Sequence, residues 1–410
     1  METTPLRIGI VGYGMIGKVH AMAHKVLPWY APGLARFGQI THVATGHRES
    51  ALKAARQLGC EFATCDFRNI TENPNIDIVH ICTPNGEHVE PLISALEHNK
   101  HIYCDKPMCA TLAEANRVRD LLLKKDANGK PLYTGTSQMT FHLRFFSAIM
   151  KAKQLLAEKQ LGRILQYRVA YLHSSSSSPF SPWKWKHSST GGASRDLASH
   201  LLDLIDALLG LPDYVLAEGI TAWPRRVGAN LTPLESLHAD DPETWQPVES
   251  EDAVTILTRH CPKDAPRFFG VIEATKLATG HEDDMFLEIN GHKGTLRFSL
   301  MNSHYLEFFG PEGKWQVSVS DDNPPEETPG VWRSLACGGR YSMPHSDFPS
   351  PKSQTGWIRA HIASLANFMH NVNEGLPGSP DLFQGYRVQS ALDAVERSFR
   401  QASPTFIKVG

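Results

Sequence analysis

Short apolar segments alternate with amphipathic stretches over the first third of the chain. Apolar segments of strand length lie at 6–11, 40–44, 77–82, 101–104 and 132–136. Between them, apolar residues recur at helical spacing in 18–27, 50–58, 87–98 and 112–125. Strands that alternate with helices in this way are typical of parallel β-α-β units. We therefore predict an α/β domain over residues 1–140, built on a doubly wound parallel sheet.

The pattern changes beyond about residue 140. A helical stretch at 144–159 leads into a strand at 164–172, and two final helices are expected at 357–373 and 384–401. Segments that alternate polar and apolar residues lie at 253–258, 268–275, 285–290, 295–298, 305–309 and 316–320. Asn290-Gly291 and the following Gly294 are typical of a hairpin turn. Residues 141–410 are therefore predicted to form an α+β domain with an open, mainly antiparallel sheet.

Two long segments interrupt this second domain. Residues 224–251 and 321–355 are rich in proline, glycine, serine and acidic residues. Loops of this length are unusual inside a compact domain, so we expect lids, arms or contacts between subunits.

Composition and charge narrow the class of partner. The 410 residues carry 41 basic and 43 acidic side chains, for a net charge of −2, and no basic block stands out. This argues against nucleic acid or an anionic membrane surface as a partner. No apolar run reaches about 18 residues, so no membrane span is expected. A small solute is the expected partner.

The cysteines and the N-terminus bear on the compartment. The seven cysteines are scattered and none lies in a C-x-x-C pair, so neither a metal site nor a disulfide framework is expected. Such a pattern fits reduced thiols. The strand pattern begins at Leu6, which leaves no room for a signal peptide. We expect a cytoplasmic protein with no bound metal.

A glycine-rich turn follows the first predicted strand. Gly12, Gly14 and Gly17 form a G-x-G-x-x-G pattern before the first helix, with Met15 and Ile16 at its centre. Glycines let backbone amides approach a pyrophosphate, and the helix N-terminus adds a favourable dipole. The pattern alone is weak, and a tight structural turn is the alternative. Its position between strand and helix favours a Rossmann dinucleotide site.

The end of the second strand bears on the choice between NAD and NADP. Enzymes that prefer NAD usually carry an acid there, which binds the ribose hydroxyls. This chain has Thr45-Gly46-His47-Arg48 and no carboxylate, so His47 and Arg48 lie where a 2′-phosphate could be held. NADP is therefore favoured over NAD. The alternative is that Arg48 begins the next helix and stays solvated.

Two further strand ends carry polar side chains. Thr83-Pro84-Asn85 follows the third strand, with His88 three residues later, and Asp105-Lys106 ends the fourth. Residues at the carboxyl ends of parallel strands face the cofactor crevice, so these are candidate cofactor contacts. Lys106 could also reach a substrate hydroxyl. The alternatives are a helix-capping asparagine beside a surface histidine, and an ordinary surface lysine.

A polar pair lies on a predicted helix of the second domain. Asp196 and His200 are four residues apart, so we expect them to share a face, beside a leucine stripe at 197, 201, 204 and 208. Asp203 adds a third polar group to that face. Spacing alone leaves metal ligands, a structural ion pair and an acid–base unit open. Gly191-Gly192 indicates a backbone that lies close to a nicotinamide or a substrate.

With these motifs, the chain resembles the Gfo/Idh/MocA family, named for glucose–fructose oxidoreductase, inositol dehydrogenase and a rhizopine catabolism protein. The likeness follows the family's order and spacing across nearly the whole chain, and is greatest to its sugar and anhydrosugar dehydrogenase branch. Departures are Asp105 for the usual glutamate, Ala198 where glycine is common, and Thr190 where a third glycine often precedes. The matching segments are the glycine fingerprint, 83–88, 105–107, 141–145, 161–164, 191–200 and 291–296.

The resemblance implies a Rossmann domain followed by an open-sheet domain, with the nicotinamide in the cleft between them. It also implies a homodimer or homotetramer formed through that sheet. Lys106, Asp196 and His200 match the family's catalytic lysine, aspartate and histidine, and the Lys106–Pro107 bond is expected to be cis.

These matches give a hydride-transfer hypothesis. His200 accepts the proton of a substrate hydroxyl while a hydride moves between the same carbon and the nicotinamide. Asp196 orients His200 and steadies its cation, and Lys106 stabilises negative charge on the substrate oxygen. The expected substrate is a sugar, anhydrosugar or cyclitol. Its hydroxyls are expected to contact Arg144, His173, Trp183, Trp185 and Lys186, with core packing as the alternative for the two tryptophans.

Two other functions stay open. A glycosidase of the same fold would use tightly held NAD transiently, with no net reduction of added cofactor. A non-catalytic NADP-sensing regulator would keep the fold and lose the base. The presence of both Lys106 and the Asp196/His200 pair argues against the regulator.

Overall fold

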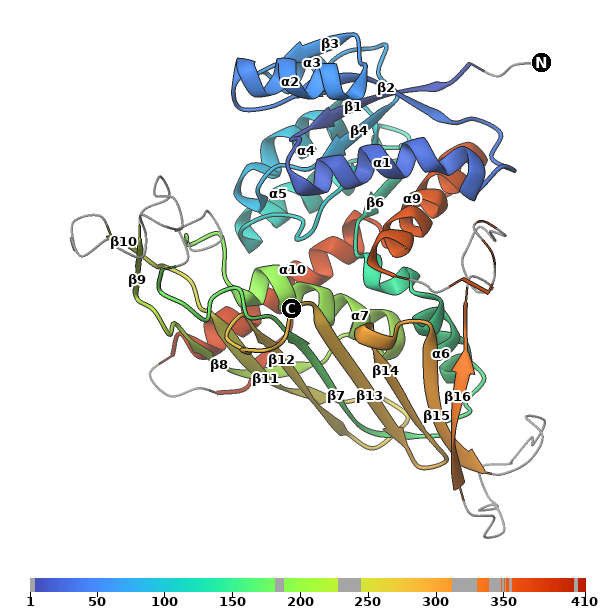
Figure 1. Ribbon diagram of the computed structural model, residues 1–410, viewed down its shortest axis with the longest axis vertical. Coiled ribbons are helices and arrows are strands. Elements are labelled where there is room, and N and C mark those ends of the chain that lie inside the picture. Colours follow the sequence, from blue (N-terminus) through green and yellow to red (C-terminus); the bar gives the residue numbers. More distant parts are fainter. Residues whose placement is uncertain are drawn as a thin grey trace.

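The computed structural model describes residues 4–180, 188–227, 245–311, 330–338, 348, 350, 352–353, 356–401 and 405–410. Two sheets dominate the molecule, with a layer of helices between them (Figure 1). The first sheet has six parallel strands in the order β3-β2-β1-β4-β5-β6. These strands are β1 (Leu6–Val11), β2 (Gly38–Ala44), β3 (Phe62–Thr64), β4 (Ile78–Ile81), β5 (His101–Cys104) and β6 (Ser137–Met139).

Helices α1 to α5 connect these strands, which confirms the predicted doubly wound sheet. They are α1 (Met15–Tyr30), α2 (Arg48–Leu58), α3 (Arg68–Thr71), α4 (Val89–Glu97) and α5 (Leu112–Leu122). The strand order reverses between β1 and β4, and ligands bind outside the carboxyl ends of strands at such a point.

The last strand of this sheet corrects one prediction. We expected it at 132–136, where Leu132 is in fact exposed in a loop. The strand is β6, whose buried residues include Ser137 and Gln138. Gln138 donates to the backbone oxygen of Ser364 at 2.9 Å, so its polarity is satisfied inside the protein. An apolar pattern could not have found this strand.

The second sheet has nine strands in the order β16-β15-β14-β13-β7-β12-β11-β8-β17. All its neighbours are antiparallel except β7 and β12, so the sheet is mixed but mainly antiparallel, as predicted. Its strands are β7 (Ile164–Leu172), β8 (Tyr214–Ile220), β11 (Ala253–His260), β12 (Phe268–Thr275), β13 (Asp284–Gly291), β14 (Thr295–Ser299), β15 (Tyr305–Pro311), β16 (Gly330–Ala336) and β17 (Ile407–Lys408).

The two long segments predicted as loops are only partly so. Residues 225–227 and 245–247 form a small ribbon of β9 (Arg225–Val227) and β10 (Trp245–Pro247), and β16 lies inside 321–355. Residues 228–244, and the strand expected at 316–320, lie outside the described residues.

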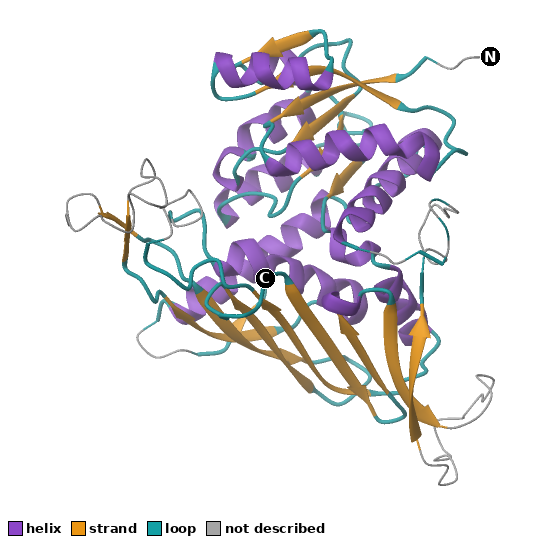
Figure 2. Cartoon of the chain, in the orientation of Figure 1, coloured by secondary structure: helices purple, strands orange, loops and turns teal. Residues whose placement is uncertain are grey.

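Helices cover one face of the nine-stranded sheet, the face toward the parallel sheet (Figure 2). They include α6 (Ser147–Ala157), α7 (Ser199–Leu209) and α10 (Leu382–Phe399). No described helix lies on the other face, where Ile220, Phe269, Val271 and Trp332 are each more than a third exposed.

The helix α9 (Trp357–Glu374) returns from the second half of the chain to the first domain, where it packs on α1. Ser364 on α9 accepts a hydrogen bond from the Tyr103 hydroxyl of β5 at 2.8 Å. Leu365, Phe368 and Met369 join the apolar core formed by Ile8, Ile10 and their neighbours. Among the described residues, no helix is long and apolar enough to cross a membrane.

Candidate active site

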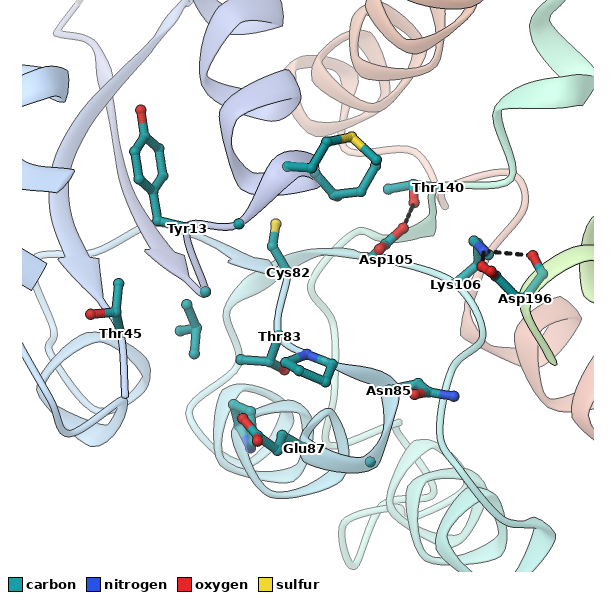
Figure 3. A pocket seen from close by; sticks show the side chains of 18 of the residues that line it. Tyr13, Thr45, Cys82, Thr83, Asn85, Glu87, Asp105, Lys106, Thr140 and Asp196 are labelled. Atoms are coloured by element: carbon teal, nitrogen blue, oxygen red, sulfur yellow. Dashed lines mark hydrogen bonds and ion pairs between the residues drawn. The ribbon is translucent and has the colours of Figure 1, made fainter. Parts of the chain in front are cut away.

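A cavity of about 1240 Å³ lies between the two domains, at the carboxyl ends of β1, β4 and β5. Figure 3 shows it running from Thr45 at one end to Lys106 and Asp196 at the other. It receives side chains from both domains, including His200 of α7 and His173 after β7. The residues predicted for cofactor and catalysis that line it are Gly12, Gly14, Met15, Ile16, Thr83, Pro84, Asn85, Asp105, Lys106, Asp196 and His200.

The glycine turn has the geometry that the sequence predicted. Gly12 adopts a φ of +90°, and a Cβ there would lie 2.6 Å from the backbone of Cys82 and Thr83. Gly17 is packed against the oxygen of Gly12, where a Cβ would come within 2.4 Å, so this glycine serves helix–strand packing. Gly14 faces open space and begins α1, which has neither a side-chain cap nor an acidic residue in its first turn. A pyrophosphate fits this uncapped helix end.

The end of β2 offers hydroxyls rather than charge. Thr45 and Ser50 line the cavity, and their Oγ atoms are 2.6 Å apart. His47 and Arg48 are exposed and are not among the lining residues. Arg48 is the first residue of α2, as in the solvated alternative.

The β4 end carries two buried polar atoms that have no partner. These are Oγ1 of Thr83 and Oδ1 of Asn85, and both residues line the cavity. Buried polar atoms are nearly always hydrogen-bonded, so a ligand with polar groups fits beside them. Together with the open space at Gly14, they make the residues present here suitable for a nicotinamide dinucleotide.

His88 lies behind this loop and does not line the cavity. Its Nε2 is 2.8 Å from the oxygen of Thr83, and its Nδ1 is 3.0 Å from the oxygen of Pro107. The ring therefore joins the β4 loop to the β5 loop. The Lys106–Pro107 peptide in the second loop is cis, as the resemblance implied.

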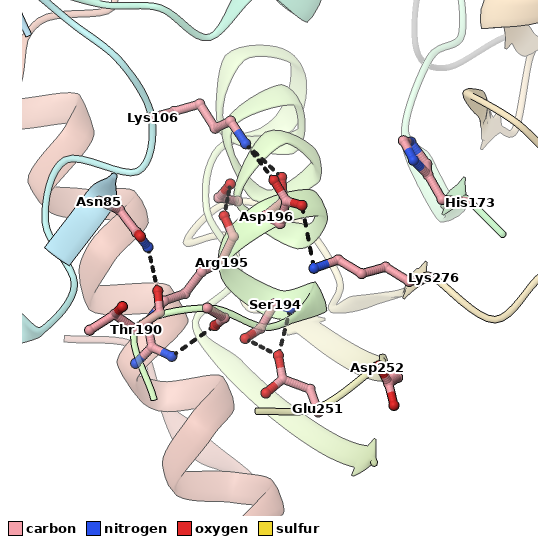
Figure 4. A network of polar contacts seen from close by, with 12 residues as sticks. Asn85, Lys106, His173, Thr190, Ser194, Arg195, Asp196, Glu251, Asp252 and Lys276 are labelled. Carbon is pink, nitrogen blue, oxygen red and sulfur yellow. Dashed lines mark hydrogen bonds and ion pairs between the residues drawn. The ribbon is translucent and has the colours of Figure 1, made fainter. Parts of the chain in front are cut away.

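Lys106, Asp196 and a second lysine, Lys276, form an ion-pair cluster that joins the domains (Figure 4). The Lys106 ammonium donates to the Asp196 backbone oxygen at 2.8 Å and to its Oδ1 at 3.2 Å. Lys276 follows β12, is 4% exposed, and places its ammonium 3.3 Å from the other carboxylate oxygen, Oδ2. One carboxylate thus holds an amine from each domain.

This arrangement gives Asp196 two partners that the sequence did not predict. Residues Ser194–Ala198, expected as the start of the α-helix, form a π-helical turn before α7. The carboxylate contacts the two lysines, and Nδ1 of His200 has no hydrogen-bond partner. The Asp196 carboxylate is thus shared by two lysines, and the orienting role expected for it toward His200 stays a prediction.

Glu251 holds the π-helical turn in place. The Ser194 amide and hydroxyl donate to its Oε1 at 2.7 and 2.5 Å. Gly192 has a φ of +101°, and a Cβ there would come within 2.4 Å of the same carboxylate. The close approach expected at Gly191-Gly192 is therefore made by Glu251.

His200 is buried and uncharged. It is 5% exposed, and burial lowers its pKa well below 6.5, with Lys106 contributing in the same direction and Asp196 opposing. A neutral imidazole in a cavity beside an ammonium can accept a proton from an alcohol.

The expected substrate contacts divide into three groups. His173 lines the cavity, with its Nε2 3.1 Å from Asp283, and the Tyr171 hydroxyl donates to the same carboxylate at 2.8 Å. Burial alone would raise the pKa of Asp283, but these two hydrogen bonds lower it. Trp183, Trp185 and Lys186 lie outside the described residues.

Arg144 is placed differently from our expectation. Its guanidinium binds Asp203 at 2.7 and 2.6 Å, Asp203 is buried and Arg144 is half-buried, and neither lines the cavity. The predicted third polar group of the Asp196/His200 face, Asp203, is thus half of an ion pair that joins the turn before α6 to α7.

Several cavity residues were not found from the sequence. They come from segments far apart in the chain, and single lysine or histidine residues carry no local signal. The residues missed are Lys276, Asp283, Tyr171, His142, Trp357 and His361.

The described residues hold no group of three or more metal-ligating side chains arranged for an ion.

Comparison with known proteins places this geometry among oxidoreductases. Residues 6–128 match the model of an oxidoreductase family with an NAD-binding Rossmann fold, and residues 149–297 match the GFO/IDH/MocA C-terminal domain. The chain is 31% identical to levoglucosan dehydrogenase of Pseudarthrobacter phenanthrenivorans, over 97% of each chain. It is 27% identical to myo-inositol 2-dehydrogenase of Thermotoga maritima, over 54% of this chain and 61% of that one.

A solved structure agrees over the whole length. Levoglucosan dehydrogenase in complex with NADH and levoglucosan superposes with a TM-score of 0.84 at 26% identity, covering 99% of this chain and 100% of that one.

Proposed function

Because this chain belongs to the Gfo/Idh/MocA oxidoreductase family, we propose that it transfers a hydride between a nicotinamide and a secondary alcohol of a sugar, anhydrosugar or cyclitol. One observation carries the proposal: Lys106 of the first domain and His200 of the second line the same cavity as the glycine turn. Levoglucosan and inositol dehydrogenases among its relatives support this substrate class.

The dinucleotide is held by the first domain. Its pyrophosphate would be bound by the backbone amides of Gly14, Met15 and Ile16. The cavity between this turn and Lys106 is lined by Thr83, Asn85 and Asp105. When bound, the nicotinamide supplies the hydride acceptor in oxidation or the donor in reduction.

His200 is the proton acceptor in the oxidation direction. Its lowered pKa keeps the ring neutral, so it can take the hydroxyl proton as the carbon is oxidised. Lys106 donates a hydrogen bond to the same oxygen and stabilises the negative charge that develops there. In reduction, the imidazolium returns the proton.

Asp196 and Lys276 position Lys106. The carboxylate binds both ammonium groups, so Lys106 is directed across the domain boundary toward α7. Lys276 neutralises the second oxygen of Asp196, which leaves the cluster with a net positive charge beside the reacting oxygen.

For the cofactor, we propose a preference for NADP over NAD. The support is the absence of a carboxylate among the described β2-end residues that line the cavity. Thr45→Asp should weaken the use of NADP⁺, because the added carboxylate would repel a 2′-phosphate. If Thr45→Asp improves the use of NADP⁺, this preference is wrong.

We also propose that two or four copies assemble over the uncovered face of the nine-stranded sheet. That face carries Ile220, Phe269, Val271 and Trp332, and large exposed apolar surfaces are typical of subunit contacts. A monomer in sedimentation experiments at micromolar concentration would contradict this assembly.

The function is tested by incubating the protein with NAD⁺ or NADP⁺ and a panel of sugars, anhydrosugars and cyclitols. The proposal expects stoichiometric formation of the reduced cofactor, faster with NADP⁺. Glycoside cleavage without net cofactor reduction would indicate the glycosidase, and cofactor binding without any turnover would indicate the regulator.

A further inference from the structure

Three aromatic side chains form one side of the cavity next to His200. They are His142, just after β6, and Trp357 and His361 in the first turns of α9, and we refer to them as the imidazole wall. The rings of His142 and His361 stack with centroids 4.2 Å apart and planes 17° apart, and Trp357 lies 4.2 Å from His361. The ring of His142 meets that of His200 edge-on at 5.0 Å.

Three nitrogen atoms of this wall lack partners. Nε2 of His142 and both ring nitrogens of His361 are buried without a hydrogen bond, and each residue is only 3% exposed. A buried polar atom without a partner costs about 1–3 kcal/mol, so such atoms normally meet a ligand or water. Three of them in one cavity wall indicate a site for a polar ligand.

The wall is electrically neutral. Burial lowers the pKa of His361 to about 3, and burial together with His361 lowers the pKa of His142 well below 6.5. Lys106 lowers both pKa values further, and its ammonium is already bound to Asp196. Each ring therefore offers one N–H donor and one nitrogen acceptor at neutral pH.

The chemistry of the wall matches hydroxyl groups. A hydroxyl can both donate and accept hydrogen bonds, as a neutral imidazole can, whereas a phosphate or carboxylate only accepts and would leave the acceptor nitrogen of each ring without a partner. Trp357 adds an apolar ring face of the kind that packs against the C–H groups of a sugar. The ionic residues Asp196 and Lys276, which also line the cavity, bind each other and are not part of the wall.

We propose that the imidazole wall is a subsite for the hydroxyls of the substrate remote from the reacting carbon, and that it selects uncharged sugars and cyclitols against sugar phosphates and sugar acids. This inference rests on the proposed function, because it takes His200 and Lys106 as the reacting end of the same site.

The test compares His361→Phe and His142→Phe with a matched control, His260→Phe. Phenylalanine keeps a stacked ring and removes both nitrogens. His260 is equally buried and stacks on Phe268 at 4.4 Å, but does not line the cavity. For each variant, KM and kcat are measured with the best neutral substrate, and calorimetry gives the dissociation constant of that sugar for the NAD(P)H-loaded protein.

Each wall variant should raise KM and the dissociation constant about tenfold, the effect of losing one to two hydrogen bonds, with kcat changed less than about threefold. His260→Phe should leave both constants unchanged. The wild type should use neutral sugars at least about tenfold better in kcat/KM than their phosphates or acids. If a wall variant fails to fold, Trp357→Leu at the half-buried rim should show the same rise in KM.

Unchanged KM and sugar affinity in the wall variants, or a wild-type preference for phosphorylated or acidic sugars, would overturn the subsite. Failure of the proposed function has a different signature. In that case the wild type binds the cofactor and oxidises no member of the panel, while calorimetry with the same neutral sugars still decides whether the wall binds them.

Discussion

At the scale of single residues, the proposed chemistry depends on keeping His200 neutral and Lys106 directed at the same oxygen. Burial and the Lys106 ammonium both lower the pKa of His200, so the two requirements support each other. The carboxylate that the sequence suggested as a partner of the imidazole binds both amines. A single carboxylate can still favour the imidazolium through its charge once the proton has moved.

Replacing the base tests its role directly. His200→Ala should lower kcat for alcohol oxidation by at least about a hundredfold, because the variant lacks the imidazole that accepts the hydroxyl proton in this mechanism. Cofactor affinity, measured by quenching of protein fluorescence, should be retained, since the glycine turn is untouched. Turnover within a few-fold of the wild type would remove His200 from the mechanism.

The pH dependence follows from the direction of the His200 pKa. Oxidation needs the neutral ring, and a lowered pKa keeps it neutral below pH 6.5. The acid limb of log kcat/KM for oxidation should therefore fall below pH 6.5, and reduction, which needs the imidazolium, should accelerate as the pH falls. A limb centred near pH 7 or above would contradict a buried neutral base.

At the scale of elements, α7 and the turn before it carry the second-domain residues that lie beside Lys106 of the first domain. Its first turn carries His200, and the π-helical turn before it carries Asp196. The Arg144–Asp203 pair fixes the same helix to the segment that leads into α6. The position of the base thus depends on an ion pair that does not reach the cavity.

Breaking that ion pair should weaken the fold more than the chemistry. Arg144→Met leaves the Asp203 carboxylate buried alone, which should lower the free energy of unfolding by about 3–5 kcal/mol. Burial raises the pKa of Asp203 to about 6 even with Arg144 present. The loss should therefore be smaller at pH 5, where protonation removes the charge, than at pH 8.

Urea unfolding at the two pH values measures this effect. The matched control is Arg397→Met, which breaks the pair between exposed Arg397 and half-buried Asp393 on α10 and should cost less than about 1 kcal/mol. If both variants lose the same free energy of unfolding, the buried pair contributes no more to stability than the surface pair.

Sequence patterns predicted elements well where burial and apolarity coincide. β1, β4, β5 and most strands of the second sheet were found because their buried residues are apolar. β6 was misplaced because its buried positions are Ser137 and Gln138. In the site, the strand-end motifs were found from local spacing. Lys276 and His361 were not, because only the folded chain brings them beside Lys106.

At the scale of the whole molecule, buried neutral histidines extend beyond the active site. His20 and His24 of α1 each place a ring nitrogen 3.1 Å from His80 of β4. Burial lowers the pKa of His24 to about 3, and burial with neighbouring histidines lowers those of His20 and His80 well below 6.5. The interior of the first domain therefore contains three uncharged imidazole rings.

This cluster should make the protein sensitive to acid. In the unfolded chain these histidines titrate near 6.5, so below that pH the unfolded state binds more protons than the native state. Their contribution to the free energy of unfolding is therefore fully present above about pH 6.5. It is lost as the pH falls toward the pKa values of the folded protein, by about 1.4 kcal/mol per pH unit for each proton that unfolding takes up.

Thermal unfolding between pH 7.5 and 5 measures the sensitivity. Tm should fall steadily below pH 6.5, and His24→Phe should reduce the slope by about one proton, whereas a change at the exposed His98 should not. A Tm that stays constant down to pH 5 would show that the cluster is charged in the native protein or does not form.

The return of α9 to the parallel sheet means that the cofactor domain is not a contiguous piece of the chain. A fragment ending at residue 140 would leave Ile8, Ile10 and their neighbours without the Leu365, Phe368 and Met369 side chains that complete their core. Chimeras that exchange cofactor domains between relatives must therefore also transplant this C-terminal helix. Because it carries Trp357 and His361, such a graft would move part of the specificity for substrate along with the specificity for cofactor.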